Sequence, residues 1–171
     1  MDKILFILAQ IVGSMAVSLQ IIGSSKPTTK EVYFYNGTCN LLFTIQYCLL
    51  GAWAGALCCL IATLRNIIFY RYKKRIPVYV LMSYLVIAIL LNYSVIHSFI
   101  DVLPLVNIVV YSIALWTKDI MYIKIVGLIT IIGGTIYDFT TKAFVSLLSQ
   151  LIDGTVGIIS LHKLRKKPKR K

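Results

Sequence analysis

Charged side chains are scarce in this sequence. They make up 14% of the 171 residues, whereas about 25% is usual for soluble globular domains. Hydrophobic residues make up 58%, and no polar stretch is long enough to form a domain of its own. These shortages exclude an ordinary soluble protein and predict a single all-α membrane domain that covers residues 1–171.

Residues that perform catalysis or bind metals are few as well. The chain has two histidines, six acidic residues and four cysteines, and the cysteines have none of the spacings of a zinc site or a redox pair. A membrane enzyme needs an acid, a base or a nucleophile that converge on one point. Asp138 at a helix end with Ser146 nearby does not make such a set. We therefore expect no enzymatic activity, no metal site and no cofactor.

What the sequence does contain is a series of seven apolar segments. Each is close to the roughly 20 residues that a helix needs to cross the hydrocarbon core of a bilayer. The fifth segment is short and carries Pro104 near its start, and only the turn region at Leu50 and Gly51 separates the second from the third, so a six-helix count stays open. A signal peptide is disfavoured because the first segment is long and no small-residue cleavage site follows it. The expected helices span residues 4–22, 33–50, 53–70, 78–96, 102–116, 121–139 and 143–161.

The basic residues indicate how these helices are oriented. The net charge of +12 does not predict nucleic-acid binding, because the basic residues form short clusters between apolar segments and in the terminal KLRKKPKRK. Positive residues in short loops stay in the cytoplasm. Seven helices place the tail and the loops after helices one, three and five on one side. Together these hold 15 of the 18 basic residues, and only Lys3 and Lys142 lie opposite. The pattern predicts an N-terminus outside the cell and a C-terminus in the cytoplasm.

The sequence also shows a weak internal repeat at an offset of 91 residues, which aligns Leu60 with Leu151 and Lys74 with Arg165. Helices one to three and five to seven both end in a basic cluster. A single helix between them lets a second three-helix unit repeat in the same orientation. The expected plan is three plus one plus three, with units at 1–75 and 99–163, a linker helix within 76–98 and a basic cytoplasmic tail at 164–171.

Two stretches of the first half carry a family resemblance. The run IQYCLLGAWAGALCCLIATLRNIIFY, with QIVGSMAVSLQIIGSS before it, resembles the YgjV-type family of bacterial inner membrane proteins. That family is similar in plan to the SWEET and PQ-loop transporters, so the resemblance implies a SWEET-like fold in the bacterial inner membrane. The chain departs from the PQ-loop pattern, because it has no Pro-Gln dipeptide and its Pro27 and Pro104 lie at helix ends. The hinge chemistry of those relatives is therefore not assigned to specific prolines.

Arg65 and Asn66 lie inside the third segment. An arginine at the centre of a membrane helix costs about 2.5–3.5 kcal/mol. Arg65 lies about 9 Å deeper than Arg71 at 1.5 Å rise per residue, so its side chain either snorkels to the headgroups or points into the bundle; Asn66 cannot snorkel as far. Asp153, in the seventh segment, lies about one turn deeper still. We hypothesise an Arg65–Asp153 pair in the cytoplasmic half of a polar cavity, in which each charge offsets the desolvation of the other.

Four further amide side chains are predicted at membrane depth: Asn40, Gln46, Asn92 and Asn107. Each has donors and acceptors that hydrocarbon cannot satisfy, so each either bonds to another helix or faces a solute. Together with the three polar residues above, they are the candidate residues of a substrate cavity.

Two other patterns are interpreted as structural. Gly51 and Gly55 have the spacing that puts two small residues on one helix face and permits close packing in lipid. Tyr47, Trp53 and Trp116 lie near helix ends, where aromatic residues collect as belts at the membrane interface.

The sequence therefore predicts a transporter that moves a small polar solute through a cavity between two three-helix units, by alternating access. The alternative is a membrane receptor that binds in the same cavity, or a scaffold without a ligand. The expected partners are the lipid bilayer, the solute, and anionic lipids bound by the tail at about 1 kcal/mol per basic residue. A second copy of the chain is left open, and nucleic acid is not expected.

Overall fold

The computed structural model describes residues 3–72 and 76–166. Within these ranges the chain forms seven α-helices, one short 3-10 helix and no strand, so the predicted all-helical fold with seven helices is confirmed and a six-helix count is wrong. The elements are α1 (Lys3–Ser25), α2 (Thr29–Leu50), α3 (Trp53–Arg71), α4 (Val78–Tyr93), η1 (Phe99–Asp101), α5 (Val102–Thr117), α6 (Ile120–Thr140) and α7 (Phe144–Lys166).

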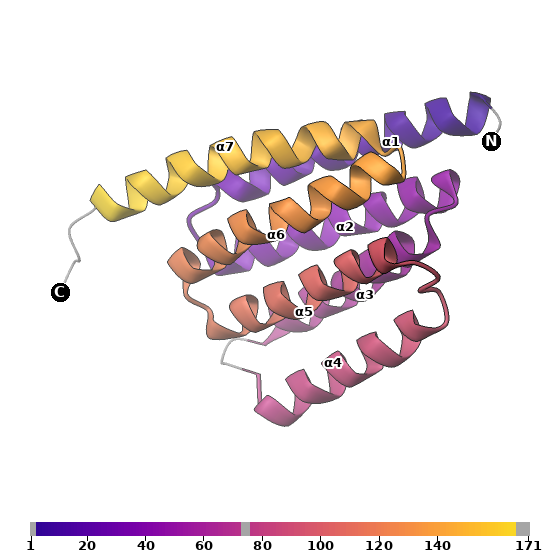
Figure 1. The fold of residues 1–171 in the computed structure, drawn as a ribbon. Coiled ribbons are helices and arrows are strands. Elements are labelled where there is room, and N and C mark those ends of the chain that lie inside the picture. Colours follow the sequence, from indigo (N-terminus) through magenta and orange to yellow (C-terminus); the bar gives the residue numbers. More distant parts are fainter. Residues whose placement is uncertain (1–2, 73–75, 167–171) are drawn as a thin grey trace.

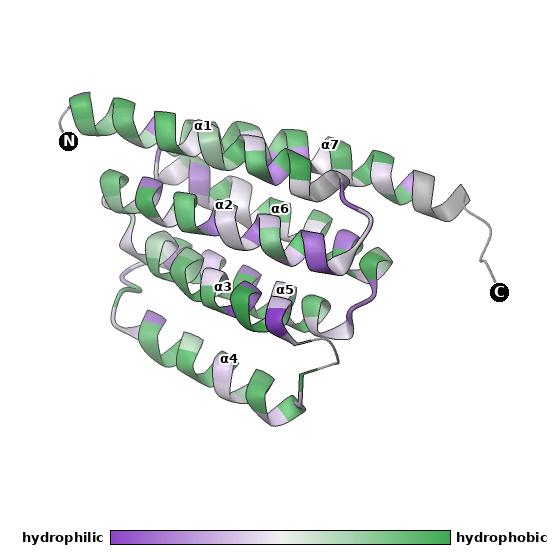
Figure 2. Cartoon of the chain, turned by 180° about the vertical axis from the view of Figure 1, so that it is seen from behind, coloured by the Kyte–Doolittle hydropathy of each residue, from purple (hydrophilic) through white to green (hydrophobic). Residues whose placement is uncertain are grey.

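Five of these helical spans are long and apolar enough to cross a membrane. They lie in α1, α3, α6 and α7, and in η1 together with α5. The helix α4 is apolar but only 16 residues long. The helix α2 has 22 residues but carries polar side chains along its length, seen as purple segments in Figure 2. Most of these side chains are at least half-buried, because α2 lies between α1 and α3.

Several helix ends differ from the expectation, among them the end of α1, at Ser25 rather than at residue 22. The start of α2 lies at Thr29 rather than at residue 33, because the Thr28 hydroxyl caps the helix: it accepts from the Glu31 N–H (3.4 Å) and donates to the Glu31 carboxylate (2.6 Å). The helix α4 stops at Tyr93, three residues early, where the Ser94 hydroxyl donates to a carbonyl of the last turn (3.0 Å). The helix α7 continues to Lys166 and so includes the start of the predicted tail.

The helices form two rows that face each other, as the front and rear helices of Figure 1 show. One row is α1, α2 and α3, and the other is α7, α6 and α5; neighbours within a row pack against each other. The rows meet at one edge through α1 and α7, and at the other edge through α3 and α5. The two middle helices, α2 and α6, therefore face each other across the centre of the bundle.

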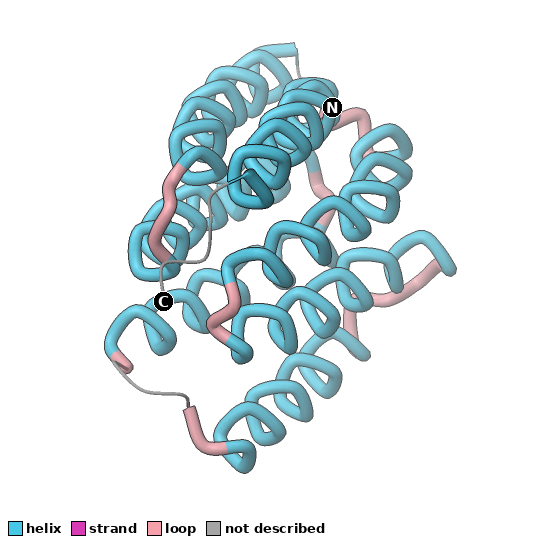
Figure 3. The backbone as a smooth tube through the Cα atoms, turned by 90° about the vertical axis from the view of Figure 1, so that its left-hand side faces the viewer, coloured by secondary structure: helices cyan, strands magenta, loops and turns pink. Residues whose placement is uncertain are grey.

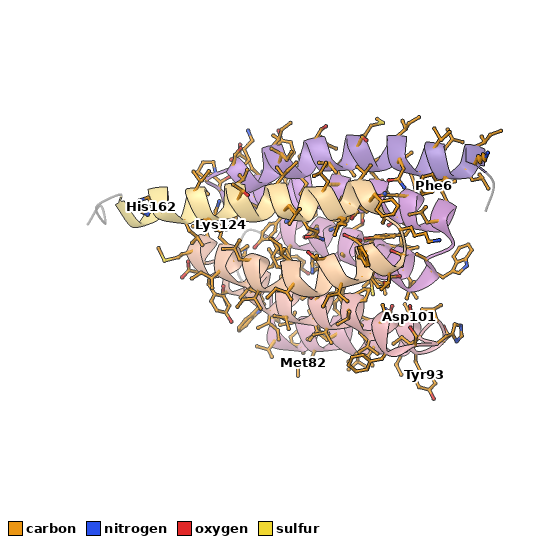
Figure 4. All side chains as sticks on the ribbon, turned by 45° about the horizontal axis from the view of Figure 1, so that its top comes forward. Phe6, Met82, Tyr93, Asp101, Lys124 and His162 are labelled. Atoms are coloured by element: carbon orange, nitrogen blue, oxygen red, sulfur yellow. The ribbon has the colours of Figure 1, made fainter. Side chains whose placement is uncertain are left out.

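The helix α4 lies at the edge of the bundle, at the bottom of Figures 1 and 3, where it packs on α3 and α5. It buries Leu81, Ala88 and Asn92. Its other face is apolar and turned outward: Met82 is 56% exposed and Tyr93 is 83% exposed, and both point away from the bundle in Figure 4. Large apolar side chains are also exposed on the outer faces of the other helices, which suits a surface covered by lipid.

The connections alternate between the two ends of the bundle. The α1–α2, α3–α4 and α5–α6 connections and the C-terminal end of α7 lie at the left in Figure 1, and the α2–α3, α4–α5 and α6–α7 connections and the N-terminus lie at the right. Lys26, Arg71 and Lys118 lie at the left end, which we call the basic end, whereas Lys142 lies at the opposite end. Because the loops alternate, an odd number of helices gathers the described basic loops on one side, as the sequence predicted.

Buried apolar clusters hold the rows together near both ends. At the basic end, a cluster joins α2, α3, α5 and α6 around Tyr33 and Leu115, and the Tyr33 hydroxyl donates to the Leu115 carbonyl (2.9 Å). At the opposite end, a cluster joins α2 to α6 around Tyr47 and Tyr137. A third cluster fixes α4 to α3 and α5 around Ala88.

Candidate solute cavity

A cavity of about 220 Å³ lies between the two rows. Pockets for drug-sized ligands measure roughly 300–1,000 Å³, so this one suits a smaller molecule. Residues from every α-helix except α4 contribute to its lining. The polar side chains of the lining are Gln20, Asn36, Asn40, Tyr47, Arg65, Asn107, Tyr111, Thr130, Tyr137, Ser146, Gln150 and Asp153.

The end of the cavity opposite the basic end is formed by a tyrosine cluster, which comprises Tyr47, Tyr137, Asp138, Ser146 and Gln150. The Tyr47 hydroxyl donates to the Asp138 carboxylate, which also accepts from the Ser146 hydroxyl (2.8 Å) and the Gln150 amide (3.4 Å). Asp138 is 0% exposed. Three donors from α2 and α7 thus satisfy a buried carboxylate on α6, and they join the two rows at this point.

Tyr137 makes a second contact between the rows at the same level. Its hydroxyl accepts from the Gly55 N–H at the start of α3 (2.8 Å), and its ring meets the Tyr47 ring edge to face, with centroids 5.8 Å apart. A Cβ on Gly55 would lie 2.7 Å from the Tyr137 ring, so this approach requires glycine. The Tyr47 hydroxyl lies 3.3 Å from the Ser146 hydroxyl near the start of α7. Each middle helix therefore contacts the first turns of a helix in the other row through a tyrosine: α2 contacts α7, and α6 contacts α3.

The wall of the cavity nearer the basic end carries an arginine cluster, which comprises Arg65, Asn66, Tyr111 and Ser112. Arg65 is 2% exposed. Its guanidinium donates to the Ser112 hydroxyl on α5 (3.0 Å) and to the Asn66 side-chain oxygen (3.4 Å), and it lies 5.4 Å from the centroid of the Tyr111 ring. Among the described residues, Arg65 Nε and the Asn66 amide nitrogen have no hydrogen-bond partner. The cluster thus holds more donors than its own acceptors use.

The predicted Arg65–Asp153 ion pair is absent from the described part of the chain. Both side chains line the cavity, one from each row. Arg65 bonds instead to neutral groups on α3 and α5, and the Asp153 carboxylate accepts from the Gln20 amide of α1 (3.1 Å). The two residues share a cavity as predicted. Their expected direct contact is wrong, because the packing of α3 on α5 and of α7 on α1 gives each of them a nearer partner.

A second, smaller cavity of about 60 Å³ continues the first toward the basic end. The two share Asn36, Tyr111 and Asp153 among their lining residues, and the second reaches Ile120 and Lys124 at the start of α6. Lys124 lies beside α7 (Figure 4), where its ammonium group donates to the Ser160 hydroxyl (2.5 Å). The polar space therefore extends toward the basic end.

The remaining predicted cavity residues divide into two groups. Asn40 and Asn107 line the cavity. Asn66, Gln46 and Asn92 are buried but lie outside the lining, so their assignment to the cavity is corrected.

The three amides outside the lining are enclosed between helices. Asn92 on α4 accepts from the Cys58 thiol on α3 (3.0 Å) and donates to the Ala88 carbonyl (2.8 Å), so it fixes α4. Gln46 lies against Gly13 of α1, where a Cβ would come within 2.6 Å of the amide. The Gln46 amide has no partner among the described residues. Helix packing explains the position of Asn92, and we have no physical account of the unpaired Gln46 amide.

The two glycines predicted to share a helix face have different roles. Gly55 lies in α3 and permits the contact with Tyr137. Gly51 lies before α3, at the C-cap of α2, with a φ of 73° and no atom within 4 Å of a Cβ position. It therefore serves the turn between α2 and α3, and the expectation that it packs against another helix is wrong.

The tyrosine cluster was not predicted from the sequence. Tyr47 was assigned to an interfacial belt, yet it is 7% exposed inside the bundle. A signal was present: Tyr47 and Asp138 are 91 residues apart, which is the repeat offset, so the alignment places them at equivalent positions of the two middle helices. Residues at equivalent positions of facing helices lie near the axis that relates the two units.

No metal-binding group is seen in the described ranges: three or more His, Cys, Asp or Glu side chains do not come together there. The four cysteines are free thiols. The end of the predicted tail, residues 167–171, and residues 73–75 of the basic loop lie outside the described residues.

A comparison with protein families identifies the class of this membrane bundle. The model of the family Imp-YgjV, described as bacterial inner membrane protein, matches residues 7–168. The chain belongs to this family. Membership of the Imp-YgjV family confirms the resemblance inferred from the first half of the sequence, and agrees with the five apolar spans in placing the chain in the bacterial inner membrane. No curated protein and no solved structure matches the chain.

Proposed function

We propose that this chain is a transporter that moves a small polar solute across the bacterial inner membrane. The observation that carries the proposal is the polar cavity between the two rows, inside a bundle whose outer surface is apolar. Ionisable and amide groups at membrane depth are costly, and in membrane proteins they commonly mark a solute or ion pathway. Arg65 and Asp153 are two such groups in its lining, and Asp138 accepts hydrogen bonds from three lining side chains.

The helix order supports a plan of two repeated three-helix units with α4 as a linker. The middle helices begin 91 residues apart, at Thr29 and Ile120, and so do the third helices, at Trp53 and Phe144. The contact of α1 with α7 is equivalent to the contact of α5 with α3 when the units are exchanged. Parallel repeats with a binding site at their interface are a recurrent transporter plan, of which SWEET proteins are one example.

In the proposed mechanism, the tyrosine cluster closes the periplasmic end of the cavity. Its bonds from Tyr47 to Asp138 and from Gly55 to Tyr137 join opposite rows, so rocking of one row against the other breaks them and opens this end. The second cavity leads toward the basic end, which the positive-inside rule assigns to the cytoplasm. A C-terminus in the cytoplasm and an N-terminus outside are part of the same proposal.

Uptake into proteoliposomes tests the proposal. The purified chain is reconstituted and assayed with a panel of labelled small polar metabolites against protein-free liposomes. We expect saturable uptake of at least one solute, and we expect Gly55→Leu to reduce it because the larger side chain displaces Tyr137. Thermal stabilisation by a solute without flux would instead favour a receptor, and neither binding nor flux would favour a scaffold.

A further inference from the structure

We propose that the solute of this cavity is a small zwitterion of the amino-acid class, with its carboxylate bound at Arg65 and its ammonium group at Asp153. The proposal rests on the proposed transport function and names the substrate class. Its basis is that one cavity presents a buried guanidinium on α3 and a carboxylate on α7 that do not pair with each other.

Arg65 is a buried cation whose described partners are all neutral. It is 2% exposed, and its guanidinium contacts the Ser112 hydroxyl, the Asn66 side-chain oxygen and the face of Tyr111. A charge removed from water is normally paired. The ion pair between Lys26 and Glu31 lies outside the lining of the cavity.

The unused donors of the arginine cluster indicate what complements this charge. Arg65 Nε has no hydrogen-bond partner among the described residues, and Arg65 lines the cavity. A guanidinium presents its N–H groups as a planar fork that fits a carboxylate with two parallel hydrogen bonds. A carboxylate of the solute is therefore the ligand that satisfies both the charge and the geometry.

Asp153 limits the net charge of the solute. It lies on α7, in the row opposite Arg65, and it lines both cavities. Its carboxylate attracts an ammonium group and repels a second carboxylate at the same site. Gln20 supports both roles, because its amide nitrogen bonds Asp153 (3.1 Å) and its buried Oε1 has no partner among the described residues, so Oε1 can accept from the ammonium group.

The spatial arrangement also agrees with the proposed transport cycle. Arg65 lies on α3 and Asp153 on α7, in opposite rows, so a zwitterion between them bridges the rows. Because the rows move apart and together during alternating access, a solute that contacts both can couple its binding to that motion. A neutral solute would leave the buried guanidinium without a counter-ion in every state.

The test measures binding to the purified full chain by thermal shift and isothermal titration. The probes are the proteinogenic L-amino acids, with glucose and glycerol as neutral compounds. For the amino acid that binds best, two analogues follow: the same compound without its amine, and its amide without a free carboxylate. We expect saturable binding of at least one amino acid and at least about 30-fold weaker binding of both analogues, as for the loss of one partner of a buried charge pair.

Variants assign the two groups. Arg65→Gln and Asp153→Asn should each weaken binding at least about 30-fold. Lys142→Gln removes a positive charge at the opposite end of the bundle, outside the cavity lining, and should leave the affinity unchanged. Arg65→Lys keeps the charge but not the fork, so it should bind with intermediate affinity; if Arg65→Gln fails to fold, this variant and Asp153→Asn provide the test.

Three results would overturn the inference: no amino acid binds, the analogue without an amine binds as tightly as the amino acid, or Asp153→Asn leaves the affinity unchanged. The second result would also mean that a cation such as Lys124, which lines the second cavity with Asp153, neutralises that carboxylate. Uptake assays separate this proposal from the one on which it rests. Flux of a neutral solute with no amino-acid binding refutes the substrate class alone, whereas amino-acid binding without flux refutes transport alone.

Discussion

The two ends of the central cavity satisfy their buried polar groups in different ways. In the tyrosine cluster, the Asp138 carboxylate receives hydrogen bonds from three side chains. In the arginine cluster, two buried nitrogen atoms lack partners among the described residues, and so does Gln20 Oε1 on the facing wall. A fully bonded cluster stabilises the contact between the rows, whereas a cluster with spare donors and acceptors is suited to bind something else. In the proposed mechanism, the fully bonded tyrosine cluster closes one end of the cavity and the arginine cluster at the other end binds the solute.

One of the two largest expected effects comes from Gly55, where Tyr137 of one row meets the start of α3 in the other. Gly55→Ala places a Cβ 2.7 Å from the Tyr137 ring, and we expect a loss of about 2–3 kcal/mol, because the ring has to move and the bond from the Gly55 N–H weakens. Gly127→Ala is the matched control, since its Cβ meets Tyr111 at an ordinary 3.6 Å. Thermal unfolding in detergent compares them, and equal melting temperatures would show that the tyrosine contact is not tight.

Two carboxylates, Asp153 in the lining of the cavity and Asp138 behind it, allow a direct comparison of the ends. Asp138→Ala leaves the Tyr47, Ser146 and Gln150 donors without their acceptor, and at about 1–3 kcal/mol for an unsatisfied buried group we expect a loss near 3 kcal/mol. Asp153→Ala removes the acceptor of Gln20 at a half-buried position and should cost about 1 kcal/mol. Unfolding of the two variants side by side checks the order. A larger loss of stability for Asp153→Ala would contradict the assignment of Asp138 to closure of the cavity and of Asp153 to solute binding.

Removing the hydroxyl of a tyrosine at each end of the cavity should show a smaller difference in stability with the same order. Tyr47→Phe removes a hydrogen bond to a carboxylate, worth about 1.5–3 kcal/mol, whereas Tyr111→Phe removes the bond from the Asn36 amide (3.1 Å), worth about 1 kcal/mol. Both rings remain in place, so packing changes little. Melting temperatures should fall in that order, and Tyr111→Phe should be the milder variant.

The smallest expected effect is the coupling between Arg65 and Asp153 in the unfolding free energy, measured without solute. Arg65 and Asp153 share no described partner, so the stability losses of Arg65→Gln and Asp153→Asn should add within about 0.5 kcal/mol. A double-mutant cycle in unfolding free energy measures this. A coupling well above that value in the empty protein would restore the direct pair that the sequence suggested.

Much of the fold could be read from the sequence because the bilayer imposes helix length and hydropathy. All seven expected segments contain a helix, and α3 begins at Trp53 as expected because the Leu50 and Gly51 turn precedes it. The early start of α2 was also encoded, since Thr28 followed three residues later by Glu31 is an N-cap pattern. Apolar runs alone do not reveal this signal.

The site was harder to predict than the fold. The depth of Arg65 left two positions open, at the headgroups or inside the bundle, and the residue is 2% exposed. Its partner depended on which helix packs against α3, and no local pattern encodes the contact of α3 with α5. Tyr47 was misassigned for a related reason. A tyrosine near a helix end fits an interfacial belt as well as a buried position between the rows, and only its relation to Asp138 in the facing helix distinguishes these two positions.

The most direct test of the account is the side from which the cavity can be reached. A variant that retains only Cys59, a half-buried cavity residue, is made with Cys39→Ala, Cys48→Ser and Cys58→Ala and treated with a membrane-impermeant thiol reagent in right-side-out and inverted vesicles. We predict labelling from the cytoplasmic side, protection from the periplasmic side, and periplasmic labelling once Asp138→Ala is added. Labelling of Cys59 from the periplasmic side alone, or from neither side in both backgrounds, would contradict closure by the tyrosine cluster.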